Sequence, residues 1–437
     1  MKKIYSLLIL ASVFFSYQAK AQIANSPYSI LGTGKILGLG GIRNQAMGGA
    51  GVSMGSTQQA NMLNPALLTY NKYYTQFEAA YYLERRNLSQ EGLPSQHDIG
   101  GNISYFHFAM PLTKWWSMGF GLRPITSINY TINSIEPIAN DNDAIVEYYN
   151  RQKLGEGGVN QIYFGHSFDL GKYITVGIEG DFVFGNIDKR FKSSLIGSTT
   201  ANNTSKLERV NHRQFTYKPG VLFKIPLADE GKKRINIGGT YQPKMDYKFE
   251  SSVVIIRSTT IDTPIDLDTL TFNDELKQTF PEVYTAGISY EHAGKLSVGV
   301  DYELKQLDDQ EVFDNSNSVS FFQLSRAERI SVGGEYTPDF MSATSYWKRI
   351  TWRGGFKYET LDYKKPFNEQ LEGRSLEDYS FNIGVSFPMI KSFSALSLAG
   401  EYGWTEDDLG EGIREEYFRV QLGLTINDRW FLKRRVN

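Results

Sequence analysis

The segment from Phe418 to Ile426 alternates strictly between apolar and polar side chains, and this alternation constrains the fold more than any other feature of the chain. The apolar positions are Phe418, Val420, Leu422, Leu424 and Ile426, and the polar positions are Arg419, Gln421, Gly423 and Thr425. Successive side chains of a β-strand point to opposite faces, so this segment is expected to form a strand with one apolar and one polar face.

The same alternation recurs along most of the chain. About fourteen strands are expected, near 73–86, 101–111, 116–130, 159–169, 173–186, 211–226, 234–250, 280–291, 296–307, 320–338, 348–360, 377–388, 393–404 and 414–426. Strands of soluble proteins usually have about 5–6 residues, whereas a tilted strand needs about 9–11 residues to cross a bilayer. Aromatic residues such as Trp115, Trp116 and Trp404 lie near strand ends, as in an interfacial girdle. The pattern therefore predicts an all-β fold, a 14-stranded antiparallel transmembrane β-barrel, rather than a soluble β-sandwich.

The connections between these segments alternate in length. Short links are expected at 112–115, 170–172, 227–233, 292–295 and 389–392. Longer links are expected near 87–100, 131–158, 187–210, 251–279, 308–319, 361–376 and 405–413. Outer-membrane barrels have short periplasmic turns and longer outside loops, so both chain ends are expected on the periplasmic side.

The first residues resemble an export signal. Lys2 and Lys3 precede an apolar run from 4 to 15, and Ala19-Lys20-Ala21 matches a small-x-small cleavage site. We expect a signal peptide over 1–21; the alternative, an uncleaved anchor, is less favoured because the run is short for a membrane span. The barrel is expected over 73–426 in the cell outer membrane, in contact with its lipid, and residues 427–437 are expected to form a periplasmic basic tail.

Composition excludes several classes of function. The chain has no Cys, so neither a disulfide nor a Cys-linked lipid anchor can form. The formal net charge of −2 gives no basic patch of the kind that nucleic acid requires. The five His residues lie in different segments without the spacing of metal ligands. We therefore expect no nucleic-acid partner, no metal and no cofactor.

Residues 22–72 differ from the rest because glycines interrupt any strand. Apolar residues such as Ile36, Leu37, Met47 and Met62 are interspersed among them. A tail without structure would be less apolar. The segment is therefore expected to fold into the lumen as a hatch, although a segment hanging in the periplasm is the alternative.

The hatch segment carries a family resemblance. Gly48-Gly49-Ala50-Gly51, followed by a small polar stretch and then Asn64-Pro65-Ala66, resembles the hatch of the FadL/TodX family of outer-membrane transporters. The resemblance implies a fourteen-stranded barrel closed by an N-terminal hatch, and the terminal segment from Ile426 resembles the ends of Bacteroidetes relatives. Independently of the resemblance, Pro65 favours the start of a helical turn that Asn64 can cap.

Other polar residues have less specific interpretations. Gly51 to Gly55 matches G-x-S-x-G, but a nucleophile elbow needs a strand before it and a helix after it, so we expect no enzyme. Glu78, Arg123, Glu179 and Asp181 are expected to face the lumen. Mutual pairing and anchoring of the hatch are favoured for them over selection of a substrate.

Two functions remain open. The first is passive uptake of a hydrophobic or amphipathic small molecule, for which the resemblance suggests fatty-acid-like or aromatic compounds. The second is an accessory or plug subunit of the type 9 protein secretion translocon, a role that the resemblance to Bacteroidetes barrels suggests. Apolar residues that lead to a gap in the hatch or the wall would favour transport. A blocked lumen with an exposed apolar patch on the periplasmic rim would favour a protein partner.

Overall fold

The computed structural model describes residues 24–31, 34–38, 40–139, 145–197, 203–228, 232–258, 264–306, 323–364, 374–389, 394–407 and 412–429. The expected signal peptide and most of the basic tail, including residues 433–435, lie outside these described residues. Within them, no helix is long and apolar enough to cross a membrane.

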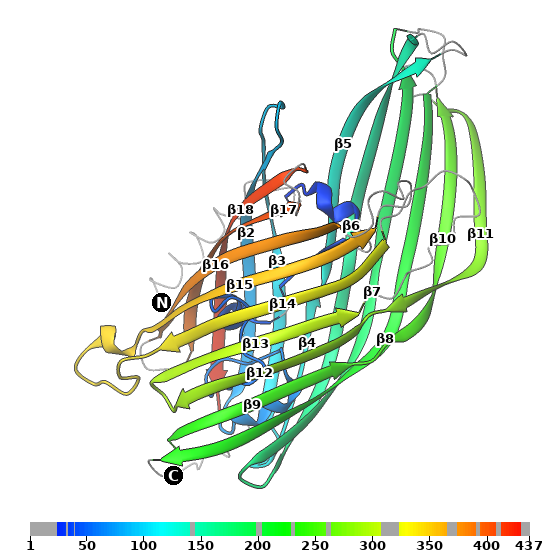
Figure 1. Ribbon diagram of the computed structural model, residues 1–437. Helices are drawn as coiled ribbons and strands as arrows, with labels where there is room; N and C mark the ends of the chain where they lie inside the picture. Colours follow the sequence, from blue (N-terminus) through cyan, green and yellow to red (C-terminus); the bar gives the residue numbers. More distant parts are fainter. Residues whose placement is uncertain are drawn as a thin grey trace, which may run out of the picture.

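The described chain is a single antiparallel sheet that closes on itself (Figure 1). Its wall is formed by β2 (Thr75–Ser89), β3 (Gln96–Pro111), β4 (Trp116–Pro124), β5 (Thr126–Ala139), β6 (Ile145–Leu170), β7 (Ile174–Leu195), β8 (Asn203–Ala228), β9 (Lys233–Gln242), β10 (Met245–Ser258), β11 (Pro264–Phe280), β12 (Glu282–His292), β13 (Leu296–Gln306), β14 (Gln323–Tyr336), β15 (Thr351–Lys364), β16 (Arg374–Pro388), β17 (Ala395–Asp407) and β18 (Arg414–Asp428).

The predicted fourteen-stranded barrel is confirmed over the described residues. Three wall strands are each divided in two by a short break, which gives the pairs β4 with β5, β9 with β10, and β11 with β12. The barrel closes where the last strand pairs with the first, from Arg414 opposite Ser89 to Asp428 opposite Thr75. Closure leaves no free edge between these two strands, which is the condition for a sheet to span hydrocarbon.

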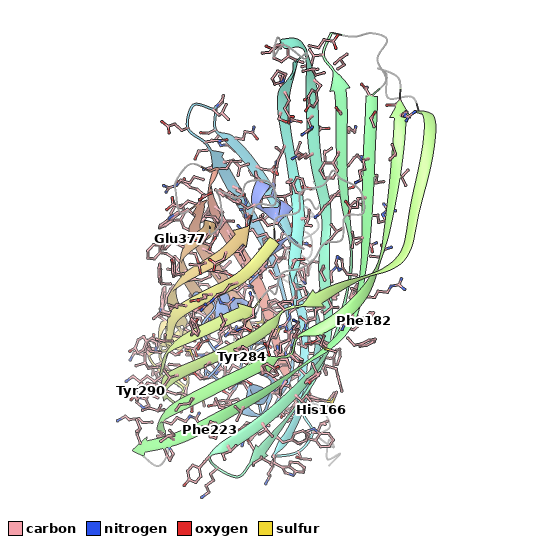
Figure 2. The ribbon with its side chains drawn as sticks, turned by 45° about the vertical axis from the view of Figure 1, so that its right-hand side comes forward. His166, Phe182, Phe223, Tyr284, Tyr290 and Glu377 are labelled. Carbon is pink, nitrogen blue, oxygen red and sulfur yellow. The ribbon has the colours of Figure 1, made fainter. Side chains whose placement is uncertain are left out.

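The apolar side chains of the alternating strands point outward. On β7 the Ile178 side chain is 50% exposed, whereas the next residue, Glu179, is buried. Phe182, Phe223 and Tyr284 likewise project from the outer face of the wall in Figure 2. The facing that alternation predicted for β2, β7 and β18 is therefore confirmed, and the outer surface is the one that lipid would contact.

Three of the expected long loops are wrong in extent, because 131–158, 187–210 and 251–279 are largely strand. In these regions β5 to β8 and the β10–β11 hairpin rise above the rest of the wall (Figure 1). The outward face of β7 shows why the pattern failed: it is apolar up to Phe184 and continues with Asn186, Asp188 and Arg190. Beyond Phe184 the outward residues are polar while the inward Ile187 is buried in an apolar cluster, so the earlier alternation is lost while the backbone ladder continues.

The N-terminal segment, defined here as residues 24–74, contains only short elements. These are the 3-10 helix η1 (Pro27–Ile30), β1 (Lys35–Ile36), the single-turn helix α2 (Ile42–Gln45) and the 3-10 helix η2 (Pro65–Tyr70). Another 3-10 helix, η4 (Tyr346–Arg349), lies in the connection between β14 and β15. The N-terminal segment contacts strands on opposite sides of the barrel, since α2 lies against β17 and β18 while η2 lies against β6, β7 and β8.

The facing of β7 generates a test with a matched control. Ile178→Arg places a charge on the outward face within the apolar band, where it should cost about 2–4 kcal/mol and reduce the folded fraction. Asn186→Arg, on the same face of the same strand but beyond the band, should assemble normally. The folded fraction is measured in membranes by the heat-dependent mobility of the barrel in gel electrophoresis. Equal losses for both variants would contradict the position of the apolar band.

Candidate functional site

The N-terminal segment is held inside the barrel by polar contacts that reach most of the wall. The Ala60 N–H donates to Glu78 Oε2 on β2 (3.1 Å), and the Ile42 N–H donates to the Tyr105 hydroxyl on β3 (2.9 Å). On β6, the Ser167 hydroxyl donates to the Ala66 carbonyl (2.9 Å). The segment is therefore fixed to several strands at once rather than to one side of the lumen.

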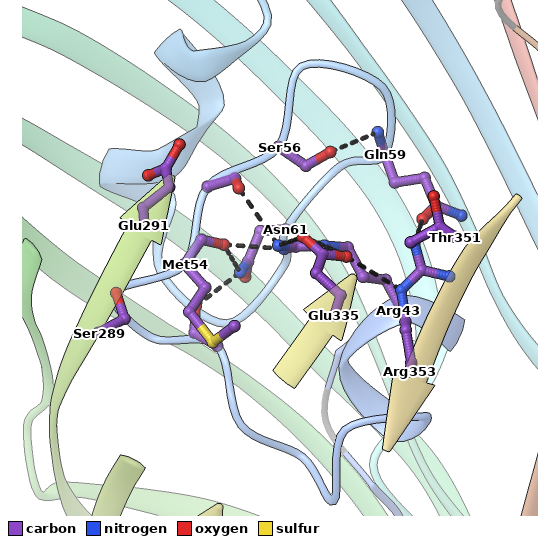
Figure 3. Close-up of polar contacts among 12 residues, drawn as sticks. Arg43, Met54, Ser56, Gln59, Asn61, Ser289, Glu291, Glu335, Thr351 and Arg353 are labelled. Atoms are coloured by element: carbon purple, nitrogen blue, oxygen red, sulfur yellow. Dashed lines mark hydrogen bonds and ion pairs between the residues drawn. The ribbon is translucent and has the colours of Figure 1, made fainter. Parts of the chain in front are cut away.

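The strongest anchor is the buried Arg43 side chain (Figure 3). Its Nη2 atom lies 2.5 Å from Glu335 Oε1 on β14, and its Nη1 atom donates to the Met54 carbonyl (2.8 Å). Glu335 also pairs with Arg353 on β15 at 3.0 Å. Burial alone would lower the pKa of Arg43, but the charge and hydrogen bond of Glu335 together raise it, so Arg43 is held in its charged form.

A second anchor uses backbone N–H groups. Those of Gly51 and Val52 both donate to Asp301 Oδ2 on β13, at 2.6 and 2.8 Å. The Ser53 hydroxyl next to them donates to the Ser289 hydroxyl on β12 (2.9 Å). Ser53 of the G-x-S-x-G match therefore lies in a turn that contacts the wall. A carboxylate that accepts two N–H groups holds this turn by charge-assisted hydrogen bonds.

The Asn-Pro-Ala part of the hatch motif connects the turn to the wall. Asn64 Oδ1 accepts from the Ala66 N–H (2.9 Å), which caps η2, and Asn64 Nδ2 donates to the Val52 carbonyl (2.8 Å). The same amide also donates to the Val221 carbonyl on β8 (3.1 Å). Asn64 thus links η2, the turn at Val52 and one strand of the wall. Pro65 occupies the first turn of η2, where its missing N–H is not needed.

Glycines on the inward face of the wall make room for the segment. A Cβ atom added to Gly355 on β15 would lie 2.1 Å from the Met47 carbonyl carbon, and one added to Gly333 would lie 2.2 Å from the Met47 oxygen. Gly48 approaches β15 equally closely and has φ +67°, a conformation that favours glycine. Other wall glycines in contact with the segment are Gly177, Gly220, Gly238, Gly384 and Gly423. Backbone of the segment and backbone of the wall are therefore in direct contact at several points.

The charged residues singled out from the sequence are buried on the inward face, and Glu78, Arg123 and Glu179 have polar partners there. Arg123 Nη2 lies 3.3 Å from Glu179 Oε1, and Lys218 Nζ lies 2.6 Å from the same carboxylate. Arg123 also donates to the Met62 carbonyl of the N-terminal segment (3.1 Å). Asp181 is buried on the same strand as Glu179, whereas Glu78 lies apart, beside Ala60. Arg123, Glu179 and Asp181 thus form one cluster, and Glu78 makes a separate contact with the N-terminal segment.

The outer half of the lumen contains a dense group of ion pairs. Arg419 bridges Glu84 (2.5 Å) and Glu401 (2.9 Å), and Arg86 pairs with Glu84 and with Glu415. Burial and the neighbouring Arg86 charge lower the pKa of Lys35, which lies 3.7 Å from Glu415. Lys35, Glu84, Arg86 and Arg419 are among the residues that line a cavity of about 10 Å³. An apolar molecule entering from this side would have to displace paired charges.

The wall has a break at Pro124, and the N-terminal segment bridges it. β3 pairs with β4 only as far as Phe106 opposite Leu122, and the chain continues as β5 after the break. β1 pairs with β5, with Lys35 opposite Ser127, and the Leu37 N–H donates to the Ile125 carbonyl (3.0 Å). Toward β3, the Asn25 N–H donates to Asp98 Oδ2 at 2.5 Å. The N-terminal segment therefore contacts both sides of this break, through ladder pairing with β5 and through one hydrogen bond to a β3 side chain.

A second break lies between β8 and the next wall strand. β8 pairs with β9 up to Gly220 opposite Thr240, and pairs with β10 again only from Asn211 opposite Glu250. An outward-opening cleft of about 420 Å³ lies at the break, and its lining includes Val221, Gly239 and Ala286. Binding sites for small molecules commonly have volumes of about 300–1,000 Å³, so this cleft is large enough to hold one.

Of the residues that hold the N-terminal segment, the sequence singled out Glu78 and Arg123, but it did not identify Arg43, Glu335 or Asp301. Arg43 and Glu335 are separated by 292 positions, and no spacing rule connects them. The wall breaks had a visible signal, because prolines stand inside otherwise regular strand patterns at 124, 243 and 281. Proline cannot donate to a ladder and occurs in sheets at edges and irregularities. Among the described residues, no group of three or more potential ligands could hold a metal ion.

Comparison with known proteins identifies a family model and a set of barrels. The family model described as BamG matches residues 1–437. The CymD monoaromatic hydrocarbon channel has 14% sequence identity and a TM-score of 0.56, with 90% of this chain and 99% of that chain covered. The toluene transporter TodX of P. putida has 13% sequence identity and a TM-score of 0.54, with 90% of this chain and 99% of that chain covered. A FadL homologue of Pseudomonas aeruginosa has 12% sequence identity and a TM-score of 0.52, with 90% of this chain and 99% of that chain covered. No curated protein matches the sequence. At these identities the likeness to solved structures establishes the fold alone.

The contact between Gly355 and Met47 gives a sharp test of how the N-terminal segment is seated. Gly355→Ala would place its Cβ 2.1 Å from backbone, so the segment must shift, and overpacking of this kind typically costs about 1–3 kcal/mol. Gly354→Ala is the matched control, because its Cβ would meet nothing nearer than 3.9 Å. Proteolysis of the N-terminal segment in the folded barrel should accelerate for the first variant only. Equal rates for both variants would show that the segment does not rest against β15.

Proposed function

The chain belongs to the BamG family, and on the geometry of its barrel we propose that it is a passive outer-membrane channel for hydrophobic or amphipathic small molecules. In this proposal the N-terminal segment is the hatch, with residues 22–72 as the hatch region and residues 73–426 as the barrel. No cofactor and no chemical step are required, because the molecule only changes its position.

The observation that carries the proposal is the cleft at the β8 break. It is an opening in the wall that is lined mainly by uncharged residues, and it lies at the level where outward side chains such as Ile237 and Ile288 are exposed and apolar. On the inward side Gly220 is in contact with Asn64 and Pro65 of the hatch motif. A lining of this kind that leads from the wall to the hatch is the arrangement expected for transport rather than for a purely structural barrel.

The polar anchoring of the hatch supports a movable role. Its wall contacts include the ion pair of Arg43 with Glu335, the Asp301 carboxylate and the Asn64 amide. Polar contacts of this kind can be replaced by water when the segment shifts, whereas a large apolar interface would lose its burial. Two of the similar barrels are named as a hydrocarbon channel and a toluene transporter, and their shared fold is consistent with such a role here.

Loosening the hatch should increase uptake. Arg43→Met removes one partner of a buried ion pair, a change that typically costs about 3–5 kcal/mol of local stability. Arg85→Met is the control, because Arg85 is exposed on the outer face of β2. Uptake of the fluorescent hydrophobic dye N-phenyl-1-naphthylamine is measured in cells that carry the full-length protein.

Cells with the wild-type protein should take up the dye faster than cells without it, and the Arg43 variant should be faster still at equal surface level. The Arg85 variant should match the wild type. Uptake that is the same with and without the protein would overturn the proposal.

A second function is favoured by a specific observation. Ion pairs around Arg419 and the strand β1 lie in the outer half of the lumen, and the cavity between them has a volume of about 10 Å³. A barrel whose outer lumen is filled by ion pairs in this way could act as an accessory or plug subunit of the type 9 protein secretion translocon. Isolation from native membranes in mild detergent separates the two functions. Stable recovery with a much larger barrel would favour the accessory role, and recovery alone would favour the channel.

A further inference from the structure

The break between β8 and the next strand is encoded by prolines. Pro243 separates β9 from β10, Pro281 separates β11 from β12, and Pro219 lies on β8 opposite the break. Among the described residues, no ladder pairs join 212–219 of β8 to 241–249. Since a proline removes a backbone donor, Pro219 and Pro243 weaken pairing across the break, and Pro281 interrupts the adjacent strand at the same level. The opening is therefore a built feature of the wall.

The cleft at this break is shaped by small residues between tyrosines. Gly239 on β9 lies opposite Ala286 on β12, and both belong to the outward face, so the wall is thin at this point. The rings of Tyr241 and Tyr284 lie 5.0 Å apart, and the exposed Tyr302 stands on the neighbouring β13. The result is a hollow floored by small residues and bordered by aromatic rings.

The rim of the cleft is polar, and it carries Glu282 together with the cationic Lys244 that interacts with it. The hydroxyls of Tyr241 and Tyr284 both donate to Glu282 Oε1, each at 2.7 Å. In the opposite direction along the same strands, the outward residues Ile237 and Ile288 are exposed and apolar. Tyrosines with an apolar body and a polar tip are typical of the membrane interface. The cleft thus has an apolar end within the band and a polar end at its margin.

The inner end of the cleft meets the hatch motif. Val221, which lines the cleft, accepts the hydrogen bond from Asn64 Nδ2, and a Cβ added to Gly220 would lie 2.2 Å from Asn64 Oδ1. The other hydrogen bond of the same amide goes to the Val52 carbonyl. A molecule seated deeply in the cleft would therefore reach the residue that joins the wall to the turn at Val52.

We propose that this cleft binds the hydrocarbon chain of a neutral or zwitterionic single-chain amphiphile from the outer leaflet. The chain lies over Gly239 and Ala286, and the head group lies at the tyrosine rim, where the opposite charges of Glu282 and Lys244 suit a head without net charge. Asn64 closes the site toward the interior. The inference rests on the proposed function for the membrane setting, and it adds the ligand class and the entry point.

The test uses the full-length protein in phosphatidylcholine vesicles with a long-chain monoacylglycerol that carries a photoreactive diazirine in its chain. Cross-links should concentrate on peptides from β8, β9 and β12. Ala286→Trp fills the cleft and should lower labelling by about tenfold, which corresponds to about 1.4 kcal/mol of binding. Ile288→Trp, on the same face of the same strand but outside the cleft lining, should label like the wild type.

Gly239→Val is a second variant that fills the cleft, and its Cβ would make ordinary contact at 3.4 Å with the Thr285 carbonyl oxygen. This variant tests binding in the cleft if the tryptophan variant does not assemble. Labelling spread evenly over the lipid-facing strands, or unchanged in the filled variants, would overturn the proposal. Equal labelling by a fatty acid with the same diazirine would overturn the head-group preference.

The readout is binding and needs no transport. Labelling of the cleft in a protein that fails to increase dye uptake would reject the channel and retain the site. Increased dye uptake by a protein in which β8, β9 and β12 remain unlabelled would retain the channel and reject the site.

Discussion

The backbone ladder between β18 and β2 is the constraint on which the rest of the structure depends. Fifteen paired positions join the ends of the wall, and without them two strand edges would present unpaired N–H and C=O groups to hydrocarbon, where each costs several kcal/mol. Closure also decides the facing of every strand, because once the sheet is a cylinder each side chain must point to lipid or to lumen. The alternation of Phe418 with Arg419 follows from this, because one side chain points to lipid and the next points to the lumen.

A closed cylinder with a polar interior raises a second requirement, since buried charges must have partners. In this chain the N-terminal segment and the wall satisfy each other: Arg43 meets Glu335, the Gly51 and Val52 N–H groups meet Asp301, and Arg123 meets both Glu179 and the Met62 carbonyl. Removing the segment would leave Asp301 and Glu335 without these donors. The charges inside the wall and the course of the segment are therefore one arrangement, which explains why the lumen of a protein with net charge −2 can be so rich in ions.

The parts that the sequence predicted are those where the surroundings differ between the two faces of a strand. The inward facing of Glu179 was assigned correctly because lipid and lumen impose opposite demands on neighbouring residues. Beyond Phe184 the outward residues are polar and the inward Ile187 is buried in an apolar cluster, so the strand from Asn186 onward no longer shows the pattern of the apolar band and is predicted as a loop. The hatch motif was visible as a pattern, but its partners were not: pairs such as Arg43 with Glu335 depend on how the barrel brings distant strands around the lumen.

The two wall breaks show how the same residue type leads to different results. At Pro124 the strand β1 pairs with β5 beside the break, and the buried ion pairs around Glu415 hold β1 in place. At Pro243 and Pro281 no part of the described chain takes that position, and small outward residues leave a hollow instead. The prolines weaken the wall in both places, but only the second opening is lined by uncharged residues toward lipid and by a hatch residue toward the lumen. If a hydrophobic molecule crosses this barrel, the physical cost of passing paired charges in the outer lumen makes the route through the wall at β8 the easier one.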